Sequence, residues 1–307
     1  MSASIPYHIP ALLDETIIGL NIKPSGTYVD ATYGGGGHTN AIIERLSASE
    51  GGRVFAFDQD TDAIARAPKD EPRLVMVHSN FRYITNFLRF HNVTAVDGIL
   101  ADLGVSSHHF DDATRGFSFR ADGPLDMRMN RNARLTAAEL LNTASPESLT
   151  SILKNYGELA QARRIADAII RRRNQGHPFE TISSLLDTIS PLIDPRKEKK
   201  ELAQVFQALR IYVNDELSAL RALLNSAPRL LRPNGRIAII TYHSLEDRLV
   251  KNFLKTGNIE GIVNKDFYGH IQAPLRQLSS KPIIPTAQEI ERNPRSRSAK
   301  LRIAEKI

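Results

Sequence analysis

The residues with the clearest chemical character form a glycine run, Tyr33-Gly34-Gly35-Gly36-Gly37-His38, between an apolar stretch and a helical pattern. Glycines at a strand-to-helix turn permit positive φ and close approach of a ligand, and the helix behind them offers unpaired amides. The dinucleotide fingerprint Gly-x-Gly-x-x-Gly fails here, because Thr39 or Asn40 stands where the third glycine belongs. A Walker loop fails too, because no Gly-Lys-Ser/Thr follows. The run predicts either a turn that receives a nucleotide-like ligand without a cradled pyrophosphate, or merely a tight turn.

Two aspartates close apolar stretches further along the chain. Asp58 ends the run 53–58, where a carboxylate can accept hydrogen bonds from both ribose hydroxyls of a cofactor. Its alternative role is to cap the helix that begins near Thr61, but Asp60 is better placed for capping. Asp102 ends the run 95–102, next to the point where open α/β sheets bind ligands. An acid inside an apolar run is costly unless it is paired or used, so both aspartates are candidate site residues.

Basic residues gather in two places. Helical patterns hold Arg163, Arg164, Arg171, Arg172 and Arg173, and the tail holds Arg295 and Arg297 together with Lys300 and Arg302. Such runs are either solvated helix faces or contacts to phosphates. The two groups together favour phosphate contact.

A third segment, Tyr242-His243-Ser244, brings a hydroxyl next to an imidazole. A hydrolase reading fails, because sequence neighbours rarely form a nucleophile–base pair and no Gly-x-Ser-x-Gly elbow is present. The adjacent pair His108-His109 lacks supporting ligands, so the sequence predicts no metal site.

The elements that must position these groups follow a regular rhythm in the first hundred residues. Apolar runs alternate with amphipathic patterns, and the predicted strands are 27–32, 53–58, 73–78 and 95–102. The rhythm stops near residue 110 and gives way to predicted helices at 146–156, 161–173 and 182–189. It resumes with helix 214–224, strand 235–241, helix 245–255 and strand 300–304. This order predicts an α/β fold with a doubly wound, mostly parallel sheet from 1–110 and 211–307, interrupted by an all-helical domain at 111–210.

Composition narrows the class of protein further. The 307 residues include no cysteine, which excludes disulfides, thiolate catalysis and cysteine metal sites. No apolar run approaches a membrane span and no signal peptide is evident at residues 1–10, so we expect a cytoplasmic protein without membrane attachment. Residues 1–110 hold 8 Lys and Arg against 12 Asp and Glu, whereas residues 111–307 hold 32 against 22. The basic remainder hints at a polyanionic partner.

The order of these segments resembles class I, Rossmann-like S-adenosylmethionine-dependent methyltransferases, and more closely the bacterial ribosomal RNA small-subunit methyltransferase H family. The resembling motifs run through the whole chain, at residues 7–15, 29–38, 101–107, 115–119, 122–129, 206–216, 243–248 and 293–302. Several of them are longer than the fold alone would require. One departure is His108-His109, where the family usually has Pro-Gln.

The resemblance implies S-adenosyl-L-methionine as the cofactor and the residues that would hold it. Expected cofactor contacts are Gly34, Gly36, Gly37, His38, Asp58, Phe81, Asp102 and, in place of the family glutamine, His109. Phe81 would stack on adenine, although core packing is its alternative role. Ser106 and Ser107, with the arginines named above, would contact the substrate.

The implied reaction is methylation of the exocyclic N4 of a decoding-centre cytosine in 16S ribosomal RNA. Methylation at C5 normally needs a cysteine nucleophile, which this chain lacks. Asp102 would accept a hydrogen bond from the amine, and His243 would help to position the base. The expected partner is small-subunit ribosomal RNA, within an assembled or nearly assembled particle, and a homo-oligomer is compatible with the sequence. Two rival readings remain open, a nicotinamide-dependent oxidoreductase and a non-catalytic RNA-binding module.

Overall fold

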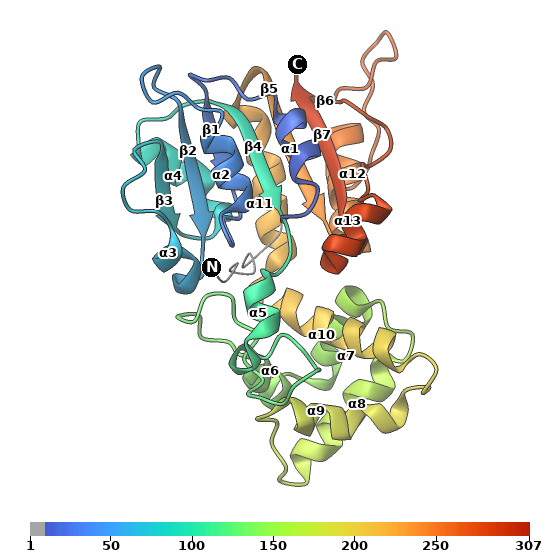
Figure 1. The fold of residues 1–307 in the computed structure, drawn as a ribbon. Helices are drawn as coiled ribbons and strands as arrows, with labels where there is room; N and C mark the ends of the chain where they lie inside the picture. The colour runs from blue at the N-terminus through green and yellow to red at the C-terminus, as the bar shows by residue number, and fades with distance from the viewer. Residues whose placement is uncertain (1–9) are drawn as a thin grey trace. The chain divides into compact units, whose positions relative to one another are not determined.

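The computed structural model describes residues 10–307, apart from the side chains of Ser107 and His108. The chain forms two compact units (Figure 1). The sheet unit comprises the described residues up to Gly104 together with Leu217–Ile307, and the helical unit comprises Val105–Glu216. The units therefore divide at 104/105 and 216/217, instead of at the expected 110/111 and 210/211. Both ends of the helical unit extend because Val105 and Val213 pack against its core.

Seven strands form one sheet in the order β3-β2-β1-β4-β5-β7-β6. Their bounds are β1 (Thr27–Asp30), β2 (Arg53–Asp58), β3 (Leu74–His78), β4 (Val96–Asp102), β5 (Leu231–Thr241), β6 (Leu275–Gln277) and β7 (Lys300–Lys306). Strands β1 to β5 pair in parallel, whereas β7 runs antiparallel to both β5 and β6. The predicted doubly wound, mostly parallel sheet is confirmed.

Side chains alternate between the two faces of the sheet along each strand, and both faces are buried. On one face, Val29, Phe55 and Ile99 share a core with residues of the second half of the sheet unit. On the other face, Tyr28, Val54 and Leu100 pack in a separate core. The helices of this unit are α1 (Leu13–Leu20), α2 (Gly37–Ile43), α3 (Thr61–Arg66), α4 (Ile84–Phe90), α11 (Glu216–Leu230), α12 (Ser244–Thr256) and α13 (Ala287–Arg292).

The helical unit has a hydrophobic core of its own. Its helices are α5 (Ser107–Asp111), α6 (Ala137–Thr143), α7 (Pro146–Gly157), α8 (Ala162–Asn174), α9 (Ile182–Ile189) and α10 (Glu198–Asn214). Local sequence explains their starts: Ser145 caps α7 with Pro146 at the first helical position, and Thr181 caps α9. Within Val105–Glu216, as described, no strand longer than a single bridge occurs.

Several element bounds differ from the prediction. The predicted helix 214–224 is wrong at its start, because Asn214 ends α10 and Asp215 adopts a left-handed conformation with φ of 49°. The new helix, α11, then continues to Leu230 despite Pro228. No residue range was predicted for the short strand β6 or for six helices, α1, α4, α5, α6, α10 and α13. In the described part of the chain no helix is long and apolar enough to cross a membrane.

Candidate functional site at the carboxyl ends of the parallel strands

The glycine run forms the turn between β1 and α2. Gly36 is the N-cap of α2 with φ of 78°, and Gly34 also has a positive φ, of 55°. A Cβ atom on Gly36 would lie 2.7 Å from the hydroxyl oxygen of Tyr33, and one on Gly37 would lie 2.8 Å from Pro10. Only glycine therefore fits at these two positions without displacing a neighbour.

Asp58 closes β2 and holds this turn. Its Oδ2 accepts a hydrogen bond of 2.8 Å from the Gly34 amide, and its Oδ1 accepts one of 2.9 Å from the Asp60 amide. Asp60 is the N-cap of α3 and accepts from the Asp62 amide, as the sequence predicted. Asp58 therefore fixes the glycine turn at the carboxyl end of β2, and its expected contact with the cofactor ribose stays a prediction.

Asp102 closes β4, and two side chains from other elements approach its carboxylate. The Tyr242 hydroxyl donates a hydrogen bond of 2.8 Å to Oδ1, and Nδ1 of His38 lies 3.6 Å from Oδ2. Nε2 of His38 lies 3.2 Å from the Ala11 carbonyl. Because a carbonyl only accepts, Nε2 carries a hydrogen and Nδ1 is left to face Asp102. The Asp102 amide donates 2.7 Å to the Thr32 hydroxyl, which ties β4 to the turn after β1.

The electrostatics of this cluster favour a proton on its carboxyl groups. Burial raises the pKa of Asp102 to about 7, with further increases from Asp30 and Glu246 and a decrease from the Tyr242 hydrogen bond. Burial also raises the pKa of Asp30 to about 6, although Thr39 and Thr32 donate to its carboxylate. The pKa of Tyr242 lies well above its usual value because of burial and the neighbouring Asp102. With its pKa of about 7, Asp102 changes charge near neutral pH. A group that acts as a general base works best when its pKa lies in that range.

This raised pKa has a measurable consequence for stability. The folded pKa of Asp102, about 7, exceeds its ordinary value of 3.8, so the folded protein binds this proton more tightly than the unfolded chain. Its contribution to the free energy of unfolding is fully present below about pH 4 and is lost as the pH rises through about 7. We expect the free energy of unfolding of Asp102→Asn to equal that of the parent protein at pH 4. At pH 8 it should be higher by a few kcal/mol, on the order of the free energy that corresponds to the pKa shift. Denaturant titration at both pH values measures this difference, and a difference that does not vary with pH would contradict the assignment.

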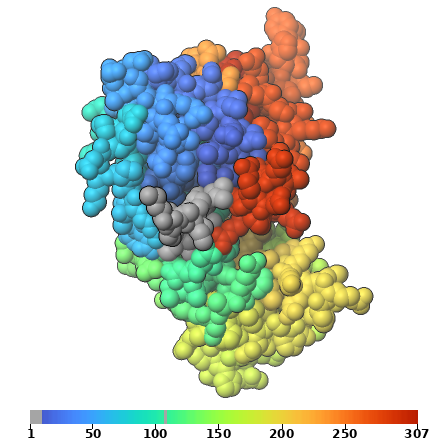
Figure 2. Space-filling model, in the orientation of Figure 1, coloured from blue at the N-terminus to red at the C-terminus, as the bar shows by residue number. Residues whose placement is uncertain are grey.

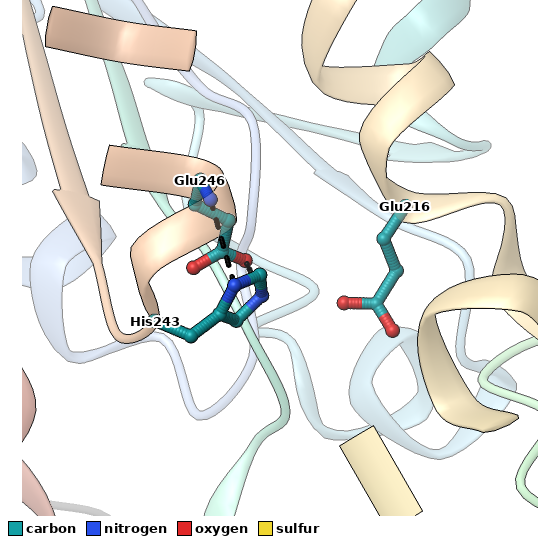
Figure 3. A group of neighbouring side chains, drawn as sticks. All are labelled: Glu216, His243 and Glu246. Carbon is teal, nitrogen blue, oxygen red and sulfur yellow. Dashed lines mark hydrogen bonds and ion pairs between the residues drawn. The ribbon is translucent and has the colours of Figure 1, made fainter. Parts of the chain in front are cut away.

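His243 follows β5 and is the N-cap of α12, where it accepts from the Glu246 amide. Its Nε2 lies 3.2 Å from Oε1 of Glu246, and the two side chains face each other in Figure 3. The other oxygen, Oε2 of Glu246, accepts 3.0 Å from the Tyr242 amide. The buried Glu246 thus orients both the imidazole and the backbone beside the Tyr242 ring. This places His243 next to the partner of Asp102, and its expected role in positioning the base stays a prediction.

Phe81 begins a short 3₁₀ turn (Phe81–Tyr83) that follows β3. It is half-buried and packs against the core of the sheet unit. Core packing is thus part of its role, while adenine stacking stays a prediction.

Ser106 and His109 belong to the helical unit. The Ser106 hydroxyl lies 3.1 Å from Nδ1 of His109, and the His109 ring stacks at 4.9 Å on Phe117. His109 is buried. Ser107 begins α5, and its side chain lies outside the described part of the structure. The expected contacts of these residues with cofactor or substrate remain untested.

The structure separates the arginines of α8 into two groups. Arg163, Arg164 and Arg171 are exposed. Arg172 instead lies over the Phe179 ring at 5.5 Å, and Arg173 donates hydrogen bonds of 3.1 and 2.7 Å to the Leu141 and Ala144 carbonyls. Arg172 and Arg173 therefore make contacts within the helical unit, and the expected phosphate contact of these arginines stays a prediction.

The basic tail divides in the same way. Arg295 and Arg297 are exposed on a 3₁₀ turn, Pro294–Ser298. Arg302 donates 2.8 Å to Asp247, and Lys300 donates 3.3 Å to the same carboxylate. Both side chains therefore pair with Asp247 within the sheet unit; Arg302 is buried there, whereas the Lys300 side chain is 43% exposed.

Sequence reasoning missed two members of the site. Asp30 closes β1 as Asp58 and Asp102 close their strands, so the strand-end rule would have found it. Tyr242 was noticed only as part of a motif with His243. Tyr242 directly follows β5, but only the sheet order reveals that β5 lies beside β4 and Asp102.

The sheet order, the antiparallel β7, the glycine turn after β1 and the acids that close β1, β2 and β4 together define a class I methyltransferase fold. The chain matches the model of the MraW methylase family over residues 6–307, and it belongs to this family. Its membership excludes the oxidoreductase and the non-catalytic module as descriptions of the chain.

Curated relatives match over nearly their full length. One from Bacteroides thetaiotaomicron, named ribosomal RNA small subunit methyltransferase H, is 57% identical over 302 residues, which is 98% of each chain. Relatives of the same name from Porphyromonas gingivalis and Amoebophilus asiaticus are 52% and 51% identical, over 98% and 99% of this chain and 97% of each relative. The resemblance found in the sequence is thereby confirmed.

Proposed function

We propose that this enzyme methylates the exocyclic N4 of a cytosine in small-subunit ribosomal RNA, with S-adenosyl-L-methionine as the methyl donor. The observation that supports it most directly is the Asp102 carboxylate, which is 12% exposed and accepts a hydrogen bond from Tyr242 at the carboxyl end of β4. The relatives named above support ribosomal RNA as the substrate.

The residues at the glycine turn fit such a cofactor. Around Gly34 a Cβ would meet nothing nearer than the Thr32 carbonyl oxygen, at 3.9 Å, so a ligand can approach the backbone of the turn there. Asp58 would bind the two ribose hydroxyls, because its carboxylate lies beside the Gly34 amide at the carboxyl end of β2. When bound, the cofactor supplies an electrophilic methyl group on a sulfonium.

Asp102 would act on the amine itself. The lone pair of the cytosine amine is delocalised into the ring, so an acceptor for its N–H hydrogens makes the nitrogen more nucleophilic. The Tyr242 hydroxyl occupies Oδ1 and fixes the plane of the carboxylate. As the new C–N bond forms, the nitrogen must lose a proton, and a carboxylate with a pKa of about 7 can take it.

The identity of the product tests this chemistry. We expect digestion of ribosomal RNA treated with this enzyme, followed by mass spectrometry, to yield N4-methylcytidine. No covalent intermediate is needed at N4, whereas attack at C5 needs a thiolate that this chain lacks. Incubation without enzyme is the control. Detection of 5-methylcytidine or of a ribose methyl would overturn the mechanism.

The helical unit, with the tail, would recognise the RNA through phosphates. Arg163, Arg164 and Arg171 are the exposed arginines of α8. We expect replacement of all three by Gln to reduce the slope of log affinity against log salt by about 2, because each phosphate that is no longer neutralised lowers the slope by roughly 0.7–0.9. Cofactor affinity should not change.

Arg173→Gln is the matched control for that triple variant. Arg173 bonds to two carbonyls within the helical unit, so its replacement should lower stability and leave the salt slope unchanged. Equal slopes for the parent protein and the triple variant would show that the three arginines are only a solvated face.

We extend the proposal to the setting of the reaction. The substrate would be a decoding-centre cytosine in an assembled or nearly assembled small-subunit particle, and the enzyme would act in the cytoplasm, where such particles form. The names of the relatives support ribosomal RNA as the partner in this setting.

A further inference from the structure

The segment between α12 and β6 presents two aromatic side chains to solvent. Phe267 is 96% exposed and Tyr268 is 82% exposed, and the neighbouring Ile262 is 60% exposed. We refer to residues 262–271 as the aromatic hairpin. Figure 2 shows this part of the chain, in orange, projecting from the surface. A soluble protein normally buries side chains of this size, so their exposure calls for a binding role.

Local hydrogen bonds give the aromatic hairpin a definite shape. Lys265 and Ile271 form an antiparallel bridge, and the Asp266 amide donates 2.9 Å to the His270 carbonyl. Oδ1 of Asp266 accepts from the amides of Tyr268 and His270, each at 2.9 Å. The Phe267 and Tyr268 rings then stand edge to face, 5.7 Å apart. The rings are therefore held outward by an ordered turn.

The chain segment that contains the aromatic hairpin carries mostly positive side chains. Residues 251–281 contain Lys251, Lys255, Lys265, Arg276 and Lys281 against Glu260 and Asp266. The four lysines are exposed, whereas Arg276 pairs with Glu305. Asp266 is occupied within the turn. The hairpin itself holds the exposed Lys265, and the segment as a whole has the charge that favours a polyanion.

We propose that the aromatic hairpin is a second RNA contact, in which Phe267 and Tyr268 stack on unpaired bases while the lysines approach the backbone. Aromatic rings beside basic side chains are the usual means of binding single-stranded RNA. A stable protein interface uses about 20–30 residues a side, far more than this hairpin offers. The inference rests on the proposed function, which supplies RNA as the partner.

The aromatic hairpin lies at the amino ends of the parallel strands, whereas Asp58 and Asp102 lie at their carboxyl ends. The hairpin directly precedes β6, and Leu275 of β6 pairs with Lys306 at the end of β7. Because β7 runs antiparallel to β5, the end of β7 lies towards the start of β5. Figure 1 shows this segment near the C-terminus. The seven residues of β4 span roughly 20 Å at about 3.3 Å each. An RNA that contacts both ends of the strands must therefore be large. The binding of a short oligonucleotide around the target base should not depend on the hairpin.

The lack of tryptophan in this chain allows a direct test. Phe267→Trp would introduce the only tryptophan of the chain at the tip of the aromatic hairpin, and it can be excited apart from the 8 tyrosines. We expect protein-free small-subunit ribosomal RNA to quench its emission through base stacking. Phe90→Trp is the matched control, since Phe90 is 79% exposed at the end of α4; its emission should not change.

Binding and methylation measurements complete the test. The double variant Phe267→Ala/Tyr268→Ala should bind the same RNA at least about tenfold more weakly, with unchanged cofactor affinity, whereas Phe90→Ala should bind as the parent does. Unquenched Phe267→Trp emission, or unchanged RNA affinity of the double variant, would overturn the inference. The inference would also be overturned if the emission of Phe267→Trp changed with protein concentration in the absence of RNA, because that change would indicate a contact between two copies. If the parent protein binds RNA through the hairpin but methylates neither this RNA nor assembled small-subunit particles, the proposed function fails and the contact stands.

Discussion

Asp102→Asn is expected to reduce turnover about a hundredfold or more while leaving cofactor affinity nearly unchanged. The asparagine can still accept the hydrogen bond from Tyr242, so the local geometry should survive. It cannot take up a proton at neutral pH, however, and the amine would lose its acceptor. Single-turnover methylation and calorimetric titration of the cofactor would measure the two quantities separately.

Tyr242→Phe provides the companion measurement. The Tyr242 hydrogen bond lowers the pKa of Asp102, so its removal should move the acidic limb of the pH–rate profile to higher pH. A purely structural role for Tyr242 would lower activity without moving that limb. If Asp102→Asn instead weakens cofactor binding and turnover equally, Asp102 serves the cofactor and not the amine.

Asp58→Ala is expected to weaken cofactor binding by about 1.5–3 kcal/mol, roughly 10- to 150-fold. The variant would lose the acceptors for the ribose hydroxyls and also the bonds from the Gly34 and Asp60 amides that hold the turn. Isothermal titration calorimetry with S-adenosyl-L-methionine measures the change directly.

Asp60→Ala is the control for this variant, because Asp60 lies two residues away and caps α3. Its replacement should lower the free energy of unfolding by about 1 kcal/mol and spare cofactor affinity. Unaltered affinity in Asp58→Ala, with the fold intact, would rule out the ribose contact.

The core of the fold was predictable because its signals are local. The strand 53–58 and the helix 182–189 were predicted with the bounds that the structure has, since each combines a clear apolar period with a turn or a cap. Helix α10 was missed because its start, Lys197, makes no side-chain cap bond. Strand β6 has three residues, too few to show an alternation of apolar and polar side chains, and its pairing with β7 depends on tertiary structure.

The site was predictable only as far as strand ends reveal it. Asp58 and Asp102 stand out because an acid closes an apolar run, and the glycine turn stands out by composition. The bond from Tyr242 to Asp102 joins residues 140 positions apart, and no spacing rule anticipates it. The division of the α8 arginines likewise depends on packing, because Arg172 and Arg173 meet Phe179 and the end of α6 only in the folded unit.

The insertion between β4 and β5 also governs the order in which the nascent chain can fold. These strands are neighbours in the sheet, yet residues 103–230 separate them in the chain. A ribosome that adds about 5–20 residues per second needs roughly 6–26 s to synthesise that stretch. Throughout this interval β4 has one unpaired edge, although Ile99 and Leu100 are fully buried in the finished protein. An open apolar edge is a template for pairing with other chains, so the time taken to translate the helical unit sets the period in which this enzyme is most prone to aggregate.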